Sequence, residues 1–300
     1  MVKKTKEPFN GKKIAWNGIQ VILPRSWQPA VIDPFHLLFE DDSGPTIEIR
    51  WSRLKQNRDV PSTIYRKLQQ TAKSYKCKIQ EKSIPNAWKK VLGGYEIKGF
   101  RWHSKESSAK GLVLHCSICR TVTLLQFYQS RNRVDDKLIE QILSTFCDHQ
   151  DNNTTHWAMY DIKADLPSRF ELIKHHFSAG AFQLDFKAKD TKVSLYRFAP
   201  ASILLSDISL YKFALLRWPV YRSQSVVKDI STINGLEYQT CLETNFYTKI
   251  ALRLLCRRKE AWLRIWHMKG PNRILALRAE GHHDHIKEIV STLGDNFSHV

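Results

Sequence analysis

The chain has 300 residues and a mass of 35.0 kDa, more than the usual single domain of ~100–200 residues, so two domains are predicted. Hydrophobic residues make up 42% and aromatic residues 11%, which indicates a packed core and excludes a disordered chain. The 47 lysines and arginines exceed the 29 acidic residues and give a formal net charge of +18. No apolar run approaches the ~20 residues of a membrane-spanning helix, so no integral membrane segment is expected.

The first half of the sequence predicts a mixture of strands and helices. In chain order these are strands over 19–27 and 47–51, a helix over 61–76, a strand that opens at Gly94, a hairpin over 112–128 and a helix over 134–146. The first helix has Ile64, Leu68, Ala72 and Tyr75 on its inward stripe, and Pro61 suits a helix start. The hairpin is expected to turn near 116–120.

The same landmarks recur in the same order roughly 140 residues later. They are strands over 160–170 and 193–197, a helix over 209–218, a strand that opens at Gly235, a hairpin over 249–268 turning near 257–260, and a helix over 286–293. The chain is therefore predicted to be α+β, with two similar domains produced by internal duplication, each an antiparallel sheet with helices packed against it. The domains span 12–148 and 156–298 and are joined by a polar linker over 148–155.

Two short segments carry a resemblance to a known family. Leu23-Pro24-Arg25-Ser26-Trp27 ends the first strand, and Leu166-Pro167-Ser168-Arg169-Phe170 occupies the matching place in the second half, with phenylalanine where the first copy has tryptophan. A strand ending in this way, followed by a strand pair, a middle helix, a long hairpin and a C-terminal helix, resembles the PsbP-like superfamily. Domains of that superfamily mostly bind partners, so the resemblance implies tandem PsbP-like domains with a non-catalytic role.

The positive charge is concentrated in the first half. Residues 1–150 contain 26 basic and 14 acidic residues, a net of +12, whereas 151–300 contain 21 and 15, a net of +6. Residues 53–98 alone contain 12 basic and 3 acidic residues, and Lys78 and Lys82 lie just beyond the predicted helix. The candidate polyanion- or partner-binding strip, near residues 66–90, consists of Arg66, Lys67, Lys73, Lys76, Trp88, Lys89 and Lys90.

Several functions fit this strip. The preferred hypothesis is a non-catalytic binding or adaptor protein for an acidic protein partner. The alternative is a sequence-nonspecific nucleic-acid-associated protein, because phosphate neutralisation releases counterions. An anionic membrane surface or a merely solvated helix face also accounts for the charge. An enzyme at the cleft between the domains is a third hypothesis, although the sequence has no nucleophile elbow, P-loop, dinucleotide turn or His-Glu-x-x-His motif.

The cysteines offer one candidate metal site. Cys116 and Cys119 lie two residues apart in a predicted turn, as in zinc knuckles, and Cys147 and His149 follow about thirty residues later as the remaining ligands. A redox pair and ordinary small residues in a hairpin are the other interpretations, and the last is preferred, so no cofactor is expected, with zinc as the alternative.

The cysteine content and the N-terminal sequence point to one compartment. Six cysteines in 300 residues do not form a disulfide scaffold, and no apolar stretch follows the basic start, so reducing cytoplasm is expected. Trp262 and Trp266 share one strand face while Leu263 and Ile265 occupy the other. Because both faces are apolar, a tight contact between the halves or a homodimer is expected.

Overall fold

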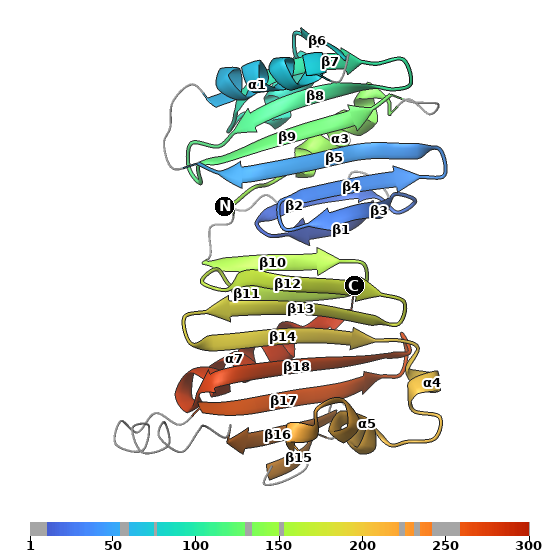
Figure 1. Ribbon diagram of the computed structural model, residues 1–300, viewed down its shortest axis with the longest axis vertical. Helices are drawn as coiled ribbons and strands as arrows, with labels where there is room; N and C mark the ends of the chain where they lie inside the picture. The colour runs from blue at the N-terminus through green and yellow to red at the C-terminus, as the bar shows by residue number, and fades with distance from the viewer. Residues whose placement is uncertain are drawn as a thin grey trace. The chain divides into compact units, whose positions relative to one another are not determined.

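The computed structural model describes residues 11–54, 60–74, 77–129, 134–149, 153–221, 226–230, 235–241 and 259–299. The chain forms an α+β protein whose strand pairs are antiparallel, and it divides into two compact units, Met1–Asp151 and Asn152–Val300 (Figure 1). None of the described helices is both long enough and apolar enough to cross a bilayer.

The first unit contains a two-stranded hairpin and a seven-stranded sheet. The hairpin is β1 (Gly11–Trp16) and β2 (Ile19–Pro24). The sheet has the order β3-β4-β5-β9-β8-β7-β6, with β3 (Gln28–Asp33), β4 (His36–Asp41), β5 (Gly44–Arg53), β6 (Lys78–Glu81), β7 (Glu96–His103), β8 (Ser108–His115) and β9 (Thr121–Tyr128). Its helices are α1 (Val60–Ser74), α2 (Asn86–Val91) and α3 (Asp136–Thr145). The first predicted hairpin is therefore present, and its turn lies between β8 and β9 as expected.

Helix α1 packs against β6, β7 and β8 (Figure 1). Its anchor is Tyr65, which is 5% exposed and packs with Phe100, Val113 and Val122 of the sheet. The predicted inward positions of Ile64 and Leu68 are confirmed, because both pack against this cluster, but the prediction missed Tyr65, which is more deeply buried than either. The predicted inward residue Tyr75 and the basic residue Lys76 lie outside the described residues.

Helix α3 packs against β2 of the β1–β2 hairpin and is the last helix of the first unit. Its N-cap, Asp135, accepts a 2.6 Å hydrogen bond from the backbone N–H of Leu138, and Ile139, Ile142 and Leu143 are buried. At its other end the Thr145 hydroxyl accepts a hydrogen bond of 3.0 Å from the backbone N–H of Ile22 on β2. The helical spacing in the sequence therefore predicted this element correctly, to within two residues of its observed start.

The second unit contains a hairpin extended by a short third strand and a second seven-stranded sheet. The smaller set is β10 (Thr154–Met159), β11 (Ile162–Pro167) and β19 (Ser298–His299). The sheet has the order β12-β13-β14-β18-β17-β16-β15, with β12 (Glu171–Ser178), β13 (Ala181–Ala188), β14 (Thr191–Phe198), β15 (Val226–Ile230), β16 (Gly235–Cys241), β17 (Lys259–Met268) and β18 (Arg273–His282). Its helical segments are α4 (Ala201–Leu204), α5 (Leu210–Arg217), η1 (Pro219–Tyr221) and α7 (His283–Asn296).

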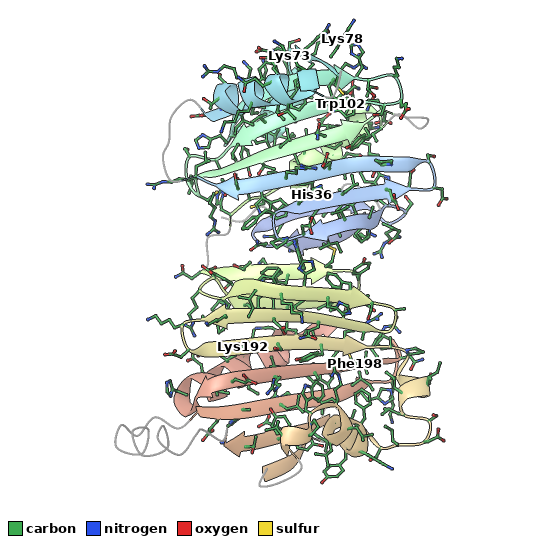
Figure 2. The ribbon with its side chains drawn as sticks, in the orientation of Figure 1. His36, Lys73, Lys78, Trp102, Lys192 and Phe198 are labelled. Carbon is green, nitrogen blue, oxygen red and sulfur yellow. The ribbon has the colours of Figure 1, made fainter. Side chains whose placement is uncertain are left out.

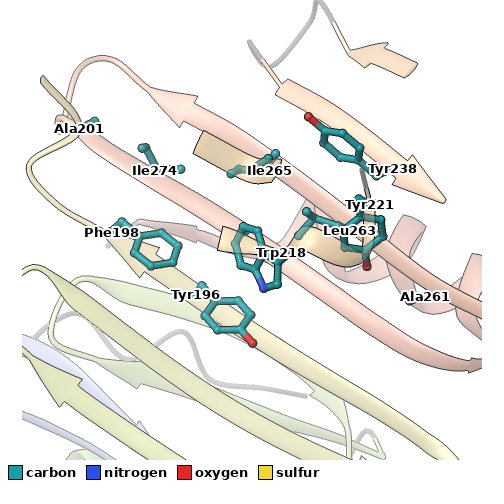
Figure 3. Close-up of a cluster of buried hydrophobic side chains, with 12 residues drawn as sticks. Tyr196, Phe198, Ala201, Trp218, Tyr221, Tyr238, Ala261, Leu263, Ile265 and Ile274 are labelled. Carbon is teal, nitrogen blue, oxygen red and sulfur yellow. The ribbon is translucent and has the colours of Figure 1, made fainter. Parts of the chain in front are cut away.

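Both faces of β17 are covered within the second unit. Leu263 and Ile265 belong to a core cluster with Trp218, Tyr221 and residues of α5 (Figure 3). On the other face α7 packs on β17 and β18, and the rings of Trp266 and Phe297 lie 5.5 Å apart. The apolar pattern of this strand, from which a homodimer or a contact between the halves was inferred, is therefore accounted for inside one unit.

The predicted second hairpin is wrong in its position. Residues 259–260, predicted as part of the turn, begin β17, and 249–258 lie outside the described residues. The described hairpin joins β17 to β18 through residues 269–272. Strand β18 was missed because its alanine, leucine, arginine and glutamate residues favour helices in isolation, and only packing on both faces makes it a strand.

Candidate functional site

The predicted basic strip begins on the solvent-facing side of α1. Arg66, Lys67 and Lys73 are all exposed there, whereas Tyr65 on the opposite side anchors the helix. Figure 2 labels Lys73 beside this helix. Helix α1 has no acidic residue in its sequence from Val60 to Ser74. Among the described residues none of these three cations forms an ion pair, so the whole exposed face of the helix presents unneutralised positive charge.

A hollow of about 400 Å³ lies beside the start of α1. It is lined by residues from α1, from the segment joining β6 to α2, from α2 and from β7, and these include Lys82, Lys89 and Lys98. The Lys98 ammonium is 3.0 Å from the Glu81 carboxylate and 5.0 Å from the centre of the Tyr65 ring. Lys82 and Lys89 are exposed and form no ion pair within the described part of the chain.

A second hollow of about 200 Å³ shares Lys82, Ser83, Ile84 and Gly99 with the first and continues it toward β8. Its apolar lining includes Ile84, Phe100 and Leu112. We call the two hollows together the basic groove. Lys110 stands at its edge, 2.6 Å from the carboxylate of Asp136.

Two glycines allow this groove to form. A Cβ atom at Gly99 would lie 2.7 Å from the Ile84 side chain and from the Lys82 carbonyl oxygen. A Cβ atom at Gly111 would lie 2.1 Å from the ring of Phe100. Because real Cβ atoms essentially never lie within 3.0 Å of another heavy atom, glycine at 99 lets the chain between β6 and α2 lie this close to β7, and glycine at 111 leaves room for the Phe100 ring.

The electrostatic environment of the groove is cationic overall. Its two glutamates are engaged, Glu81 with Lys98 and Glu96 with His115 at 3.0 Å. Burial raises the pKa of the Tyr65 phenol, and the neighbouring Glu81 carboxylate raises it further, so Tyr65 is neutral at physiological pH. The groove cations that form no ion pair among the described residues are therefore Lys82, Lys89 and Arg101.

Trp88 does not belong to an exposed aromatic surface, and this part of the prediction is corrected. It is 5% exposed on α2, and its indole N–H donates a hydrogen bond of 3.2 Å to the carbonyl of Asp136. Trp88 joins α2 to α3 and contributes only to the wall of the groove. Lys90 is exposed on the same helix but does not line the groove, and Lys76 lies outside the described residues.

Sequence reasoning missed the cations that the sheet supplies to the groove. Lys98 lies on β7 and Lys110 on β8, where Arg101 and Lys110 are cross-strand partners. No local sequence pattern predicts that Lys98 and Lys110 lie near α1. Gly99 was a sequence signal for this arrangement, because a glycine within a strand often marks a place where another backbone segment approaches closely.

The predicted metal ligands are only partly brought together. Cys116, Cys119 and His149 converge, but the fourth residue beside them is Asp148 and not Cys147. The Cys147 thiol instead donates a 2.6 Å hydrogen bond to the carbonyl oxygen of His149. Asp148, the first residue of the predicted polar linker, is buried at 3% exposure.

The redox alternative for these cysteines finds no support in their environment. Burial raises the pKa of the Cys119 thiol to about 11, although a hydrogen bond with Thr121 acts in the opposite direction. Redox-reactive cysteines have lowered pKa values and a large thiolate fraction at neutral pH. The raised pKa therefore keeps the Cys119 thiol protonated at neutral pH.

No protein-family model and no curated protein matches the sequence. Among solved structures, a protein from Bacteroides thetaiotaomicron aligns at a TM-score of 0.32 and 13% identity over 52% of this chain, which spans about half of that protein, 53%. The immunity protein TplEi of T6SS from Pseudomonas aeruginosa aligns at 0.35 and 10% identity, over 98% of this chain and 99% of its own. The same protein complexed with "L" peptide aligns at 0.37 and 10%, over 96% and 98%.

Proposed function

We propose that the protein is a non-catalytic binding protein, an adaptor, whose basic groove holds an acidic segment of a partner protein. The observation that carries the proposal is the pair Lys82 and Lys89, two exposed ammonium groups without acidic partners beside a hollow of about 400 Å³. Carboxylates of a partner neutralise these groups, and an apolar side chain of the same segment packs in the hollow beside Ile84.

A protein partner fits the groove better than a nucleic acid does. Sequence-independent binding of single strands uses exposed aromatic rings on which bases stack. The aromatic residues at the groove, Tyr65, Trp88 and Phe100, are each 5% exposed or less and offer no free ring face. Nucleic acid is the second candidate because the exposed face of α1 has cations and no acidic residue.

The test uses charge reversal with a matched control. The double variant Lys82→Glu/Lys89→Glu changes the groove, whereas Lys187→Glu/Lys189→Glu changes two exposed lysines of the second unit by the same total charge. The probes are fluorescent peptides rich in glutamate with one aromatic residue, charge-neutral peptides of the same length, and short single- and double-stranded oligonucleotides. Binding is followed by anisotropy in the full-length protein.

We expect the acidic peptides to bind the unchanged protein and the control, and to lose at least about tenfold in affinity for the groove variant. Equal losses in both variants would show only a response to net charge and contradict the groove. Binding of oligonucleotides without binding of acidic peptides would replace the adaptor with the nucleic-acid function. Crosslinking from Lys82 and Lys89 in cell extract, with nuclease treatment as a control, then identifies the partner.

We further infer that the two units arose by internal duplication of one PsbP-like domain. In support, the sheet orders correspond strand for strand, β3-β4-β5-β9-β8-β7-β6 with β12-β13-β14-β18-β17-β16-β15. The turn that follows each Leu-Pro pair is also closed by the same backbone hydrogen bond. The Trp27 N–H donates to the Pro24 carbonyl at 3.1 Å, and the Phe170 N–H donates to the Pro167 carbonyl at 2.9 Å. Superposition of experimental coordinates of the separate units tests this; different strand connections would contradict it.

A further inference from the structure

Four side chains that bind metal ions in proteins converge at the turn between β8 and β9. Cys116 and Cys119 lie in this turn, and Asp148 and His149 follow α3. One donor atom from each, two sulfurs, one nitrogen and one oxygen, lies within 4.8 Å of all the others. Cys116 and Asp148 are buried, and Cys119 and His149 are half-buried. The cluster is separate from the basic groove, whose lining includes none of these residues.

Backbone hydrogen bonds fix both halves of the cluster. The Cys116 N–H donates to the carbonyl of Thr121 at 2.9 Å, which closes the turn that contains both cysteines. On the other side, Cys147 and Gln20 exchange backbone hydrogen bonds of 2.7 and 2.9 Å. This bridge holds the residues that follow it, Asp148 and His149, beside the turn. The side chains are therefore brought together by ordered backbone.

The hydrogen bonding of the Asp148 carboxylate is incomplete among the described residues. Its Oδ1 atom accepts a hydrogen bond from the Tyr95 hydroxyl at 3.1 Å and lies 2.9 Å from the Nδ1 atom of His149. Its Oδ2 atom is buried and has no hydrogen-bond partner among the described residues. No lysine or arginine of the described chain pairs with it. A buried carboxylate oxygen without a partner is costly, and a bound cation removes that cost.

The distances fit a tetrahedral ion. Bonds of ~2.3 Å to sulfur and ~2.05 Å to nitrogen at a tetrahedral angle place those two ligand atoms about 3.5 Å apart. The Cys116 Sγ atom lies 3.5 Å from the Nδ1 atom of His149. Two thiolates on the same ion lie about 3.8 Å apart, and all four donor atoms already lie within 4.8 Å of one another.

The donor types identify the ion. Two thiolates select against magnesium and calcium, and a carboxylate is a poor ligand for copper(I). Sulfur, nitrogen and oxygen donors at tetrahedral spacing are typical of zinc, and four protein ligands leave no open position for a substrate. The Tyr95 hydroxyl, which donates to Asp148, orients that carboxylate as an outer-shell partner.

We propose that Cys116, Cys119, Asp148 and His149 bind one structural zinc ion that ties the β8–β9 turn to the segment after α3. Both thiols lose their protons to solvent when the ion binds, and the His149 ring coordinates in its neutral form. The ion crosslinks positions about thirty residues apart and thereby fastens the end of the first unit to its sheet.

The test starts from the full-length protein without a histidine tag, purified under reducing conditions. Elemental analysis is expected to give about one zinc per chain. Replacement by cobalt(II) is expected to produce the visible bands of a tetrahedral ion and a near-ultraviolet thiolate-to-cobalt band. Neither measurement depends on a variant that has to fold. Loss of zinc to a strong chelator is expected to lower the melting temperature, with recovery when zinc is restored.

Variants then separate this ligand set from the one the sequence predicted. Cys116→Ser, Cys119→Ser and Asp148→Asn are each expected to lose at least about tenfold in zinc affinity. Cys147→Ser is expected to retain the metal, because a serine hydroxyl also donates to the His149 carbonyl. Cys77→Ser is the control for loss of a cysteine elsewhere in the unit. Circular dichroism confirms that each variant is folded.

Several outcomes overturn the proposal. One is protein with reduced thiols, shown by thiol titration, that binds neither zinc nor cobalt. Another is a Cys116–Cys119 disulfide that persists under reducing conditions. A third is loss of metal in Cys147→Ser with retention in Asp148→Asn, which would assign the fourth ligand to the sulfur.

Discussion

The guanidinium group of Arg197, on β14, donates two hydrogen bonds to a single oxygen of Asp161, in the turn between β10 and β11. Arg273, at the start of β18, donates a third to the same oxygen at 2.9 Å. Arg197 is only 8% exposed, and its guanidinium also lies 4.4 Å from the centre of the Phe182 ring. One carboxylate therefore connects the hairpin of the second unit to two strands of its sheet.

Replacement of Asp161 by asparagine is expected to destabilise the second unit by about 2 kcal/mol near neutral pH, because two largely buried cations lose their counter-ion. Burial raises the pKa of Asp161, but the hydrogen bonds from Arg197 and Arg273 outweigh it and leave the pKa below its ordinary value. The stabilisation is therefore complete above the unfolded pKa of ~3.9 and disappears as the pH falls through the folded pKa.

The measurement is denaturant unfolding of the unchanged and Asp161→Asn proteins from neutral pH down into the acid range. The difference in stability is expected to shrink toward zero in acid. Asp190→Asn, at an exposed position in the turn between β13 and β14, is the control. A difference that does not vary with pH would show that the carboxylate acts by shape and not by charge.

Replacement of Tyr65 by alanine is expected to cost about 3 kcal/mol, because it removes the buried anchor of α1 from Phe100 and Val113. Tyr65→Phe keeps the ring and is expected to change stability by less than about 1 kcal/mol. Gln70→Ala, on the exposed face of the same helix, serves as the control. Unfolding followed by circular dichroism measures each change. If Tyr65→Ala were as stable as Gln70→Ala, some other contact would hold α1.

Replacement of Gly111 by alanine is expected to destabilise the first unit by about 2 kcal/mol, since the new methyl group overlaps the Phe100 ring and forces that ring to move. Gly94→Ala is the matched control, because a Cβ atom there meets nothing within 4 Å. Midpoints of urea unfolding compare the two. Equal midpoints would mean that Phe100 moves away without cost.

Replacement of Asp135 by alanine is expected to cost about 1 kcal/mol, because the N-cap hydrogen bond to the Leu138 N–H is lost. Asp136→Ala removes only an exposed pair with Lys110 and is expected to cost about 0.5 kcal/mol or less. Thermal unfolding distinguishes them. The reverse order would show that the ion pair, and not the cap, fixes the start of α3.

Local patterns predicted the helices well. The helix predicted over 134–146 is α3 (Asp136–Thr145), and the helix predicted over 209–218 is α5 (Leu210–Arg217). Such patterns depend on which side of one element faces the core, which a sequence records directly. Strand β18 was missed because it is buried on both faces, so no alternation distinguishes it.

The sites were predicted less well because tertiary contacts create them. Lys98 and Lys110 reach the groove through strand pairing, and Trp88 is buried by an interaction with α3. Asp148 looked like a linker residue beside polar neighbours, but the bridge between Cys147 and Gln20 draws it into the first unit. In each case the deciding contact joins residues far apart in the chain.

The strand order β3-β4-β5-β9-β8-β7-β6 also has a kinetic consequence. Each flank is a meander of sequential neighbours, and only the β5–β9 pair, Ile47 opposite Phe127 through Arg53 opposite Thr121, joins the two flanks. Closing this long loop costs entropy before any contact across it forms. The two meanders are therefore expected to form early in folding. The pairing of β5 with β9 is expected to be the slow step that sets the folding rate, because contacts between residues far apart in the chain slow folding.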